Sequence, residues 1–264
     1  MTQHHTELLM YVAPEPIRAA NERWIARILE QLGHTRLSAE GLSLPELWLS
    51  PDLLLTQTCG YPLMTALRGQ VRIVGRPRYE LPDASAGNHC SLIISRVDDP
   101  RKTLADFHNS RGVINSDDSN SGMNLLRHRL APLHQDGRFF ADVGISGSHR
   151  ESLRWLREGK ADLAAIDSVT FAYLAQYTAE EVSGLRVVAR SAFSPTLPFI
   201  TVMATPSVRW CCASSGTAAG LGDRGLAGVG RLVANVVGTA ATLGAQGLFE
   251  RRGVRARTLG EPGA

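Results

Sequence analysis

The most constraining feature of this chain is a short apolar segment that stops at a hydroxyl-rich turn and continues as a helical pattern, within residues 113–130. Val113 and Ile114 end a predicted strand, and apolar residues recur at helical spacing from Met123 to Leu130. Small polar residues fill the turn between them: Asp117, Ser119, Asn120, Ser121 and Gly122. A helix that begins near Ser121 directs unpaired backbone N–H groups and the positive end of its dipole outward, which suits an oxyanion. An ordinary capped helix start has the same composition, so both interpretations stay open.

The same order of strand, polar turn and helix recurs along the chain, which predicts an α/β fold. Three more apolar runs end in polar residues: 53–57 in Gln57, 139–145 in Ser146 to His149, and 161–167 in Asp167. Ligands of open α/β sheets bind at the carboxyl ends of the strands. We therefore expect these polar ends to face a ligand.

Five motifs occur in a fixed order along the chain: T-Q-T-C-G-Y-P at 56–62, S-N-S-G-M-N at 119–124, S-G-S-H at 146–149, G-K-A-D-L-A-A-I-D at 159–167 and P-T-L-P at 195–198. Together they resemble the phosphate, phosphite and phosphonate substrate-binding proteins of ABC transporters, from about Leu8 to Val202. The resemblance implies the periplasmic binding protein type II fold, in which two doubly wound α/β lobes close on a ligand about a hinge.

This implied fold divides the chain into four parts: lobe one at 1–95, lobe two at 96–189, a return to lobe one at 190–206, and an atypical tail at 207–264. Apolar runs predict strands at Leu8–Val12, 53–57, 71–74, 91–96, 185–188 and 199–203. A helix is expected from Pro14 to a stop at Gly33. We expect the chain to cross between the lobes at about Cys90 to Val97 and again at 199–203.

Three of the candidate residues have two interpretations each. The resemblance places His149 on an oxyanion contact, whereas a surface histidine near a helix start is the plain alternative. Asp167 either meets a cationic or hydroxyl end of the ligand, as the resemblance implies for an acid there, or caps the helix that follows. Tyr61 either contacts the ligand or packs with its ring half-buried.

The sequence thus predicts a non-catalytic binding protein for a small oxyanion such as a phosphonate, phosphite or phosphate ester. The candidate ligand-binding residues are Tyr11, Gln57, Tyr61, Ser91, Ser119, Asn120, Ser121, Gly122, Ser146, Ser148, His149 and Asp167. Alternatives on the same scaffold are a ligand sensor or a cytosolic enzyme of the cofactor-biosynthesis kind, in which His149 and Asp167 would be the acid–base groups. No nucleophile and base occur at a recognisable spacing.

Composition excludes several other classes. With 44% hydrophobic and 20% charged residues and a net charge of +3, the chain is typical of a soluble globular protein. Its arginines are spread along the chain, so no nucleic-acid surface is expected. The four cysteines lack C-x-x-C spacing, and neither a metal, a cofactor nor a disulfide framework is predicted. The uncharged run 232–249 contains Asn, Gln, Thr and Gly, so we expect no membrane span.

The N-terminal residues have no basic segment followed by an apolar one of signal-peptide length, which predicts a cytoplasmic protein as written. A true start further upstream would instead fit a periplasmic protein. The expected partners are the ligand and an ABC transporter permease.

The composition changes after Pro206. Residues 207–264 contain twelve of the 25 glycines, seven arginines and no lysine or histidine, and they include the pair Cys211 and Cys212. Such a glycine content disfavours the amphipathic helices that the resemblance implies there. Our hypothesis is a frameshift near codon 206, and the alternative is a divergent low-complexity tail.

Overall fold

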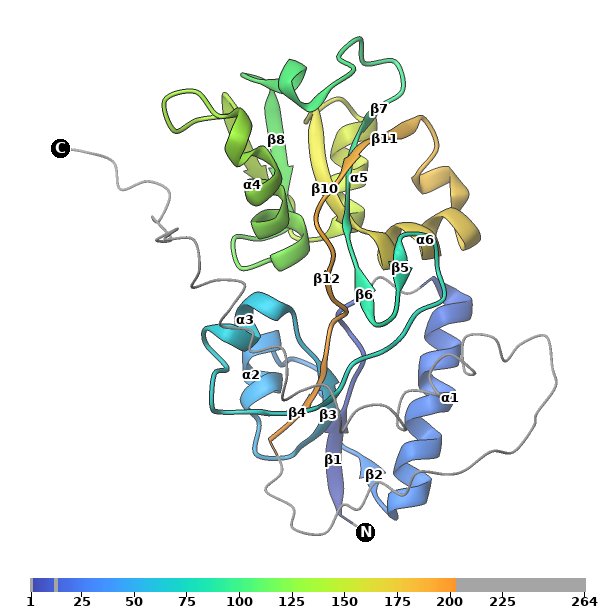
Figure 1. Cartoon of the computed structure of the whole chain (residues 1–264). Helices are drawn as coiled ribbons and strands as arrows, with labels where there is room; N and C mark the ends of the chain where they lie inside the picture. The colour runs from blue at the N-terminus through green and yellow to red at the C-terminus, as the bar shows by residue number, and fades with distance from the viewer. Residues whose placement is uncertain (1, 12–13, 203–264) are drawn as a thin grey trace.

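The computed structural model describes residues 2–11 and 14–202, which form two lobes joined by a small third sheet (Figure 1). The expected α/β architecture of two lobes is confirmed. The tail at 207–264, with its cysteine pair and the frameshift hypothesis, lies outside the described residues. No helix within the described ranges is both long and apolar enough to cross a membrane.

Lobe one contains a five-stranded sheet in the order β2-β1-β3-β13-β4. Strand β1 runs parallel to β2 and β3, while β13 runs antiparallel to β3 and β4. Its strands are β1 (Gln3–Thr6), β2 (Thr35–Arg36), β3 (Leu53–Gln57), β4 (Arg72–Gly75) and β13 (Phe199–Thr201). Its helices are α1 (Glu15–Leu32), α2 (Leu44–Leu49) and α3 (Gly60–Met64). In Figure 1, α1 lies on one side of this sheet and α2 with α3 on the other.

The longest helix, α1, begins and ends where the sequence predicts. A proline in its first turn needs no N–H partner, and Gly33 ends it in the left-handed conformation at φ 66°. Its buried residues Ile25, Ile28 and Leu29 recur at helical spacing and pack against Leu54 and the other apolar side chains of this face.

Lobe two contains a second five-stranded sheet in the order β11-β7-β10-β8-β9. Its strands are β7 (Ser91–Arg96), β8 (Arg111–Ile114), β9 (Asp142–Ile145), β10 (Leu163–Asp167) and β11 (Leu185–Arg190). Its regular helices are α4 (Leu125–Leu130), α5 (His149–Arg157) and α6 (Ser168–Tyr177). Short turns of helix complete it: η1 (Leu104–Phe107), the π-helical η2 (Asn120–Asn124), η3 (Ala131–Leu133) and η4 (Ala179–Glu181).

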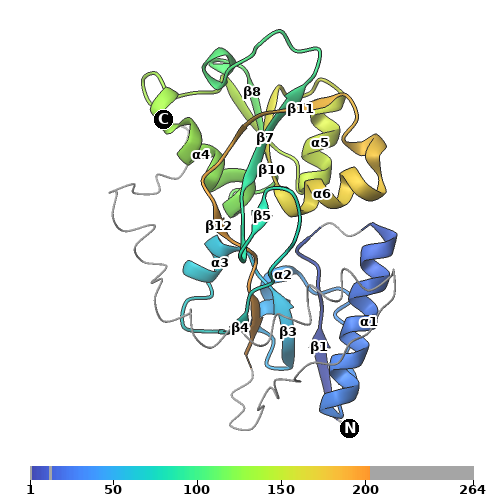
Figure 2. The same ribbon diagram turned by 45° about the vertical axis from the view of Figure 1, so that its right-hand side comes forward.

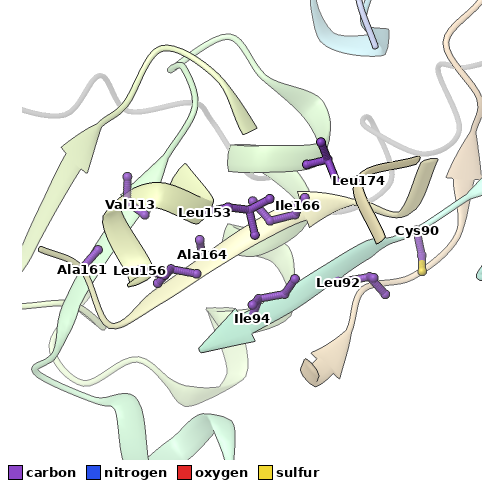
Figure 3. Packing of buried hydrophobic residues seen from close by; sticks show 10 residues of the cluster. All are labelled: Cys90, Leu92, Ile94, Val113, Leu153, Leu156, Ala161, Ala164, Ile166 and Leu174. Atoms are coloured by element: carbon purple, nitrogen blue, oxygen red, sulfur yellow. The ribbon is translucent and has the colours of Figure 1, made fainter. Parts of the chain in front are cut away.

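Strand β10 shows why lobe two has helices on both faces of its sheet. All five of its residues are buried, and successive side chains point to opposite faces. Ala164 and Ile166 pack with residues of α5 and α6 in the cluster drawn in Figure 3. Leu163 and Ala165 pack on the other face with η1 and α4. The doubly wound arrangement predicted for this lobe is thereby confirmed.

The lobes are joined by a three-stranded sheet in the order β12-β6-β5, which lies between them in both ribbon views (Figures 1 and 2). Its strands are β5 (Ala84–Ser85), β6 (Asn88–His89) and β12 (Ser194–Pro195). The chain passes upward through β6 and returns through β12, because β6 leads into β7 of lobe two and β12 leads into β13 of lobe one.

Two expectations about the crossings were wrong. Strand β7 lies wholly within the second sheet, paired with β10 and β11, so a boundary at residue 95 falls inside lobe two. Strand β13 lies inside the first sheet between β3 and β4, so it does not cross. Apolar runs identify buried strands, but they do not show which sheet supplies the partners.

The expected first strand at Leu8–Val12 is also wrong. Strand β1 is the more polar segment Gln3–Thr6, because it pairs on both sides, with β2 and with β3. The backbone N–H of His5 donates to the carbonyl of Asp52 at 3.0 Å. The neighbouring strands therefore decide the strand position here, against local β propensity.

Candidate functional site

The polar ends of the strands meet where lobe one faces lobe two. The turn between β3 and α3 of lobe one approaches η2 of lobe two, and the backbone N–H of Asn120 donates to the Cys59 Sγ at 3.3 Å. A Cβ atom on Gly60 would lie 3.7 Å from the side-chain Nδ2 of Asn120. Backbone N–H groups around Cys59 favour its thiolate, but burial has the larger effect and raises the pKa of the Cys59 thiol.

The hydroxyl-rich turn is a helix start with its own cap. The Ser119 Oγ accepts the backbone N–H of Gly122 at 3.0 Å, and the Ser119 carbonyl accepts the N–H of Asn124. The helix begins as the π-helical turn η2 before it continues as α4. The capped-start interpretation is therefore satisfied geometrically, while the Ser119 hydroxyl proton stays available to another acceptor.

Ser121 joins this turn to two other segments. Its carbonyl accepts the hydroxyl of Ser91 at 2.8 Å, and its own Oγ lies 2.9 Å from the His149 Nε2. All three side chains are buried. The structure thus brings three of the expected residues into direct contact.

Gly122 is required by close packing at this point. A Cβ atom there would lie 1.7 Å from the Asn115 Oδ1 and 3.2 Å from the His149 Cε1. Any side chain would displace one of these two neighbours. Gly122 therefore lets the end of β8 and the start of α5 approach η2.

His149 is the first residue of α5 and is buried, so its interpretation as a surface histidine is wrong. Ser148 makes the cap instead, because its Oγ accepts the backbone N–H of Glu151 at 3.1 Å. Burial lowers the pKa of His149, and the Asp167 carboxylate opposes this shift. The imidazole is therefore neutral at pH 7.

Asp167 caps the helix that follows it, as one of its two interpretations predicts, and it also lies against His149. Its Oδ1 accepts the backbone N–H of Thr170 at 2.7 Å and caps α6, while its Oδ2 lies 3.4 Å from the His149 Nε2. The same nitrogen of His149 therefore faces both Ser121 and Asp167. A nucleophile relay needs the carboxylate on Nδ1, so that Nε2 is free to accept the serine proton. This arrangement instead holds the Ser121 hydroxyl in place.

The lobe-one side of the site contains Tyr11 and Gln57. The Gln57 Nε2 donates to the carbonyl of Leu197 at 3.2 Å, and the N–H of Leu197 donates to the Tyr11 hydroxyl at 3.3 Å. Both side chains are buried. The P-T-L-P segment thereby ties the end of β3 to the segment after β1.

Two tyrosines beside Tyr11 were missed from the sequence. The rings of Tyr11 and Tyr79 lie 5.5 Å apart, and those of Tyr79 and Tyr173 lie 6.4 Å apart, each pair nearly perpendicular. Tyr79 comes from the loop before β5 and Tyr173 from α6 of lobe two. Tyr173 follows the Asp167 cap on the same helix, which was an available signal, whereas the loop around Tyr79 has no periodicity.

Burial raises the pKa of all three tyrosines, and the negative charge of Asp167 adds to the increase in each case. Burial also lowers the pKa of His89, whose ring lies 6.4 Å from that of Tyr11. At pH 7 the tyrosines and both histidines are therefore neutral, beside the carboxylate of Asp167.

Three expected residues make their contacts elsewhere. The Ser146 hydroxyl contacts the carbonyls of Ile114 and Ser148 and lies 2.7 Å from the Ser152 Oγ, so its contacts lie between the end of β8 and the first turn of α5. Ser148 is engaged as the α5 cap. Tyr61 is half-buried in α3, and in the described structure its side chain makes no hydrogen bond to the other candidates. Within the described ranges, no three His, Cys, Asp or Glu side chains gather as a metal site would require.

Comparison with known proteins shows the family of the chain. Residues 51–208, more than half of the 264, match the family of periplasmic substrate-binding proteins of phosphonate ABC transporters. The chain belongs to this family. Its members are periplasmic substrate-binding proteins rather than enzymes, so the enzyme alternative has no support from the family. No curated protein sequence matches the chain.

Solved structures show the same fold at low sequence identity. A binding protein component of a phosphonate ABC transporter from Pseudomonas aeruginosa is 14% identical, with a TM-score of 0.63 over 77% of this chain and 70% of that one. PhnD1 of Prochlorococcus marinus, solved with methylphosphonate, is 13% identical, with a TM-score of 0.62 over 76% of each chain. The aliphatic sulphonate-binding protein SsuA of Escherichia coli is 14% identical, with a TM-score of 0.51 over 76% of this chain and 65% of that one.

Proposed function

We propose that this protein binds a small phosphonate, or a related phosphite or phosphate ester, between its two lobes. The observation that carries the proposal is the buried contact of Ser121, His149 and Asp167 opposite the β3–α3 turn of lobe one. The side chains that meet there are neutral hydrogen-bonding groups around one carboxylate, which supports a ligand at this junction.

The proton of the neutral His149 imidazole determines what Ser121 offers a ligand. When the proton is on the Nε2 of His149, the N–H group points at the Asp167 Oδ2 and the Ser121 Oγ. Ser121 then accepts from the imidazole and keeps its own hydroxyl proton for an oxygen of the ligand. His149 therefore positions Ser121, and the hydroxyl of Ser119 at the start of η2 is the second donor.

Binding requires the lobes to separate and close again. The Asn120 N–H that now donates to Cys59 becomes available to a ligand oxygen when the lobes part. The sheet of β5, β6 and β12 is the connection about which we propose that the lobes rotate. We propose ligand contacts for Tyr11, Gln57, Ser91, Asn120 and Gly122 from their places around this junction.

The test uses thermal unfolding with methylphosphonate, phosphite, phosphate and alkylsulfonate, followed by calorimetry with the best ligand. Ser121→Ala removes one donor, and we expect it to weaken binding by about 1 to 3 kcal/mol. Ser116→Ala is the matched control, because its hydroxyl contacts Asp118 in the same turn. Stabilisation by none of the four anions, or equal affinity of Ser121→Ala and the parent chain, would refute the proposal.

We also propose that the protein works in the periplasm and delivers its ligand to an ABC transporter permease. The family supports this over the cytoplasmic location expected from the N-terminal residues. Cells that carry the gene should take up a labelled phosphonate faster than cells from which it is deleted. Equal uptake by both would contradict a transport function and would favour the ligand sensor.

A further inference from the structure

The charge at the lobe junction limits which phosphonates suit it. Asp167 is nearly fully buried, and its ion-pair contact within the described residues is with His149, without an arginine or lysine. A dianionic ligand beside this carboxylate would be repelled, since like charges in a poorly solvated site interact strongly. A ligand that carries a positive charge near Asp167 removes this penalty. This step rests on the function proposed above.

The side chains next to Asp167 are suited to a particular kind of cation. We call Tyr11, Tyr79 and Tyr173 the aromatic corner. Neighbouring rings of the aromatic corner are nearly perpendicular, at 87°, with centroids 5.5 and 6.4 Å apart. Mutually perpendicular rings present faces and edges in several directions. The faces of aromatic rings attract cations, and several faces together bind quaternary ammonium groups.

Several hydrogen-bond acceptors beside Asp167 are already engaged. The Asp167 Oδ1 accepts the N–H of Thr170, and its Oδ2 faces His149. The Tyr11 hydroxyl accepts the N–H of Leu197. A primary ammonium group has three N–H donors that each need an acceptor, and leaving them unpaired in a buried site is costly. A quaternary ammonium group has no N–H donor, so it leaves no donor unpaired.

We propose that the aromatic corner and Asp167 bind a quaternary ammonium group, so that the ligand is a zwitterion with a trimethylammonium end and a phosphonate or phosphate-ester end. The anionic end lies at Ser121, which His149 connects directly to Asp167. The two ends of the ligand are therefore joined by a short linker. The aromatic corner draws on both lobes, since Tyr173 belongs to α6 and Tyr11 to lobe one.

Calorimetry on the full chain separates charge from shape. The three probes are 2-(trimethylammonio)ethylphosphonate, 2-aminoethylphosphonate and 3,3-dimethylbutylphosphonate, the last having the shape of the first without its charge. We expect the trimethylammonio compound to bind roughly tenfold or more tighter than its neutral counterpart, from the usual strength of cation–π contacts. It should also bind tighter than the primary amine. Phosphocholine in place of the first probe distinguishes a phosphate ester from a phosphonate.

Variants on α6 test whether the rings produce the preference. Tyr173→Leu should reduce the ratio of the trimethylammonio to the neutral affinity towards one, whereas Tyr173→Phe should keep it. Tyr177→Leu is the matched control on the same helix, because Tyr177 is exposed. Each variant is first checked for an unchanged thermal unfolding midpoint.

The outcomes separate this inference from the proposed function. If phosphonates bind but the neutral compound or the primary amine binds as tightly as the quaternary one, the inference is overturned and the function stands. If Tyr173→Leu keeps the full preference, the aromatic corner is not its source and the inference is overturned. If no phosphonate or phosphate ester binds, both are overturned.

Discussion

The contribution of Asp162 to the stability of lobe two depends on pH. Asp162 lies just before β10, and its carboxylate accepts hydrogen bonds from the backbone and the guanidinium of Arg111 at 2.9 to 3.1 Å, with Arg101 at 3.2 Å. Burial raises the pKa of Asp162, but these hydrogen bonds and charges together outweigh burial and lower its pKa to about 2.

The size of the effect follows from the difference between the folded and unfolded pKa values. A fall from an ordinary value of 3.8 to about 2 corresponds to roughly 2.5 kcal/mol of stability, at about 1.4 kcal/mol per pH unit. Because the folded pKa is the lower one, this stability is complete above about pH 5 and is lost as the pH falls through 3.8 towards 2. Asp162→Asn removes the titrating group.

The assay is urea unfolding of the parent chain and of Asp162→Asn at several pH values. The free energies of unfolding should differ most at pH 7, and the gap should shrink by roughly 1 kcal/mol at pH 3 and by roughly 2 kcal/mol at pH 2. Asp98→Asn is the control, since Asp98 contacts Arg96 in the same region but its side chain is 81% exposed. A gap that stays constant from pH 7 to pH 2 would show that Asp162 is not held ionised by these arginines.

Four further predictions concern the site and the core. Gly122→Ala forces Asn115 aside and should destabilise the fold by about 1 to 3 kcal/mol in urea unfolding; an unchanged midpoint would mean that the turn relaxes freely. Ser119→Ala loses a helix cap and should cost about 1 kcal/mol, measured in the same way, and Ser119→Asp should restore it. Leu156→Ala empties part of the lobe-two core and should cost about 2 to 5 kcal/mol, whereas a loss below 1 kcal/mol would contradict its full burial. Because burial lowers the pKa of His149, calorimetry between pH 6.5 and 8 should give a nearly constant affinity for a ligand that does not itself titrate there, and binding that strengthens as the pH falls would indicate a charged imidazole.

Several of the strands that local sequence identified, among them β7 and β10, are buried on both faces. All residues of β10 are buried, and so are all residues of β7 except the last. A continuous apolar run was therefore sufficient to predict the bounds of both strands to within two residues. Strand β1 failed the same test, because its buried residues His4, His5 and Thr6 are polar and depend on neighbours that lie about 30 to 50 residues away along the chain. Local pattern contains no information on such partners.

The sequence predicted the site residues that lie in a recognisable motif and missed two tyrosines that lie outside the motifs. Ser121, His149 and Asp167 each end a strand or start a helix, so the rule for ligands of α/β sheets found all three. The Nε2 of His149 faces both Ser121 and Asp167 because of the orientation of the imidazole ring. Spacing along the chain does not determine such an orientation. Tyr79 was missed because it reaches the site from an irregular loop, through contacts with residues on two other segments.

The position of β13 imposes an order on biosynthesis. Lobe two is one continuous stretch of chain, so its sheet can close as soon as β11 has been synthesised. The sheet of lobe one cannot close so early, because its fourth strand, β13, consists of residues 199–201 and lies between β3 and β4. Strands β3 and β4 leave the ribosome more than a hundred residues before β13 does. Until then β3 has an open edge and part of its apolar face is uncovered, which exposes it to pairing with other nascent chains. A chaperone that shields β3 and β4 during synthesis should therefore raise the yield of folded protein more than one that acts on lobe two.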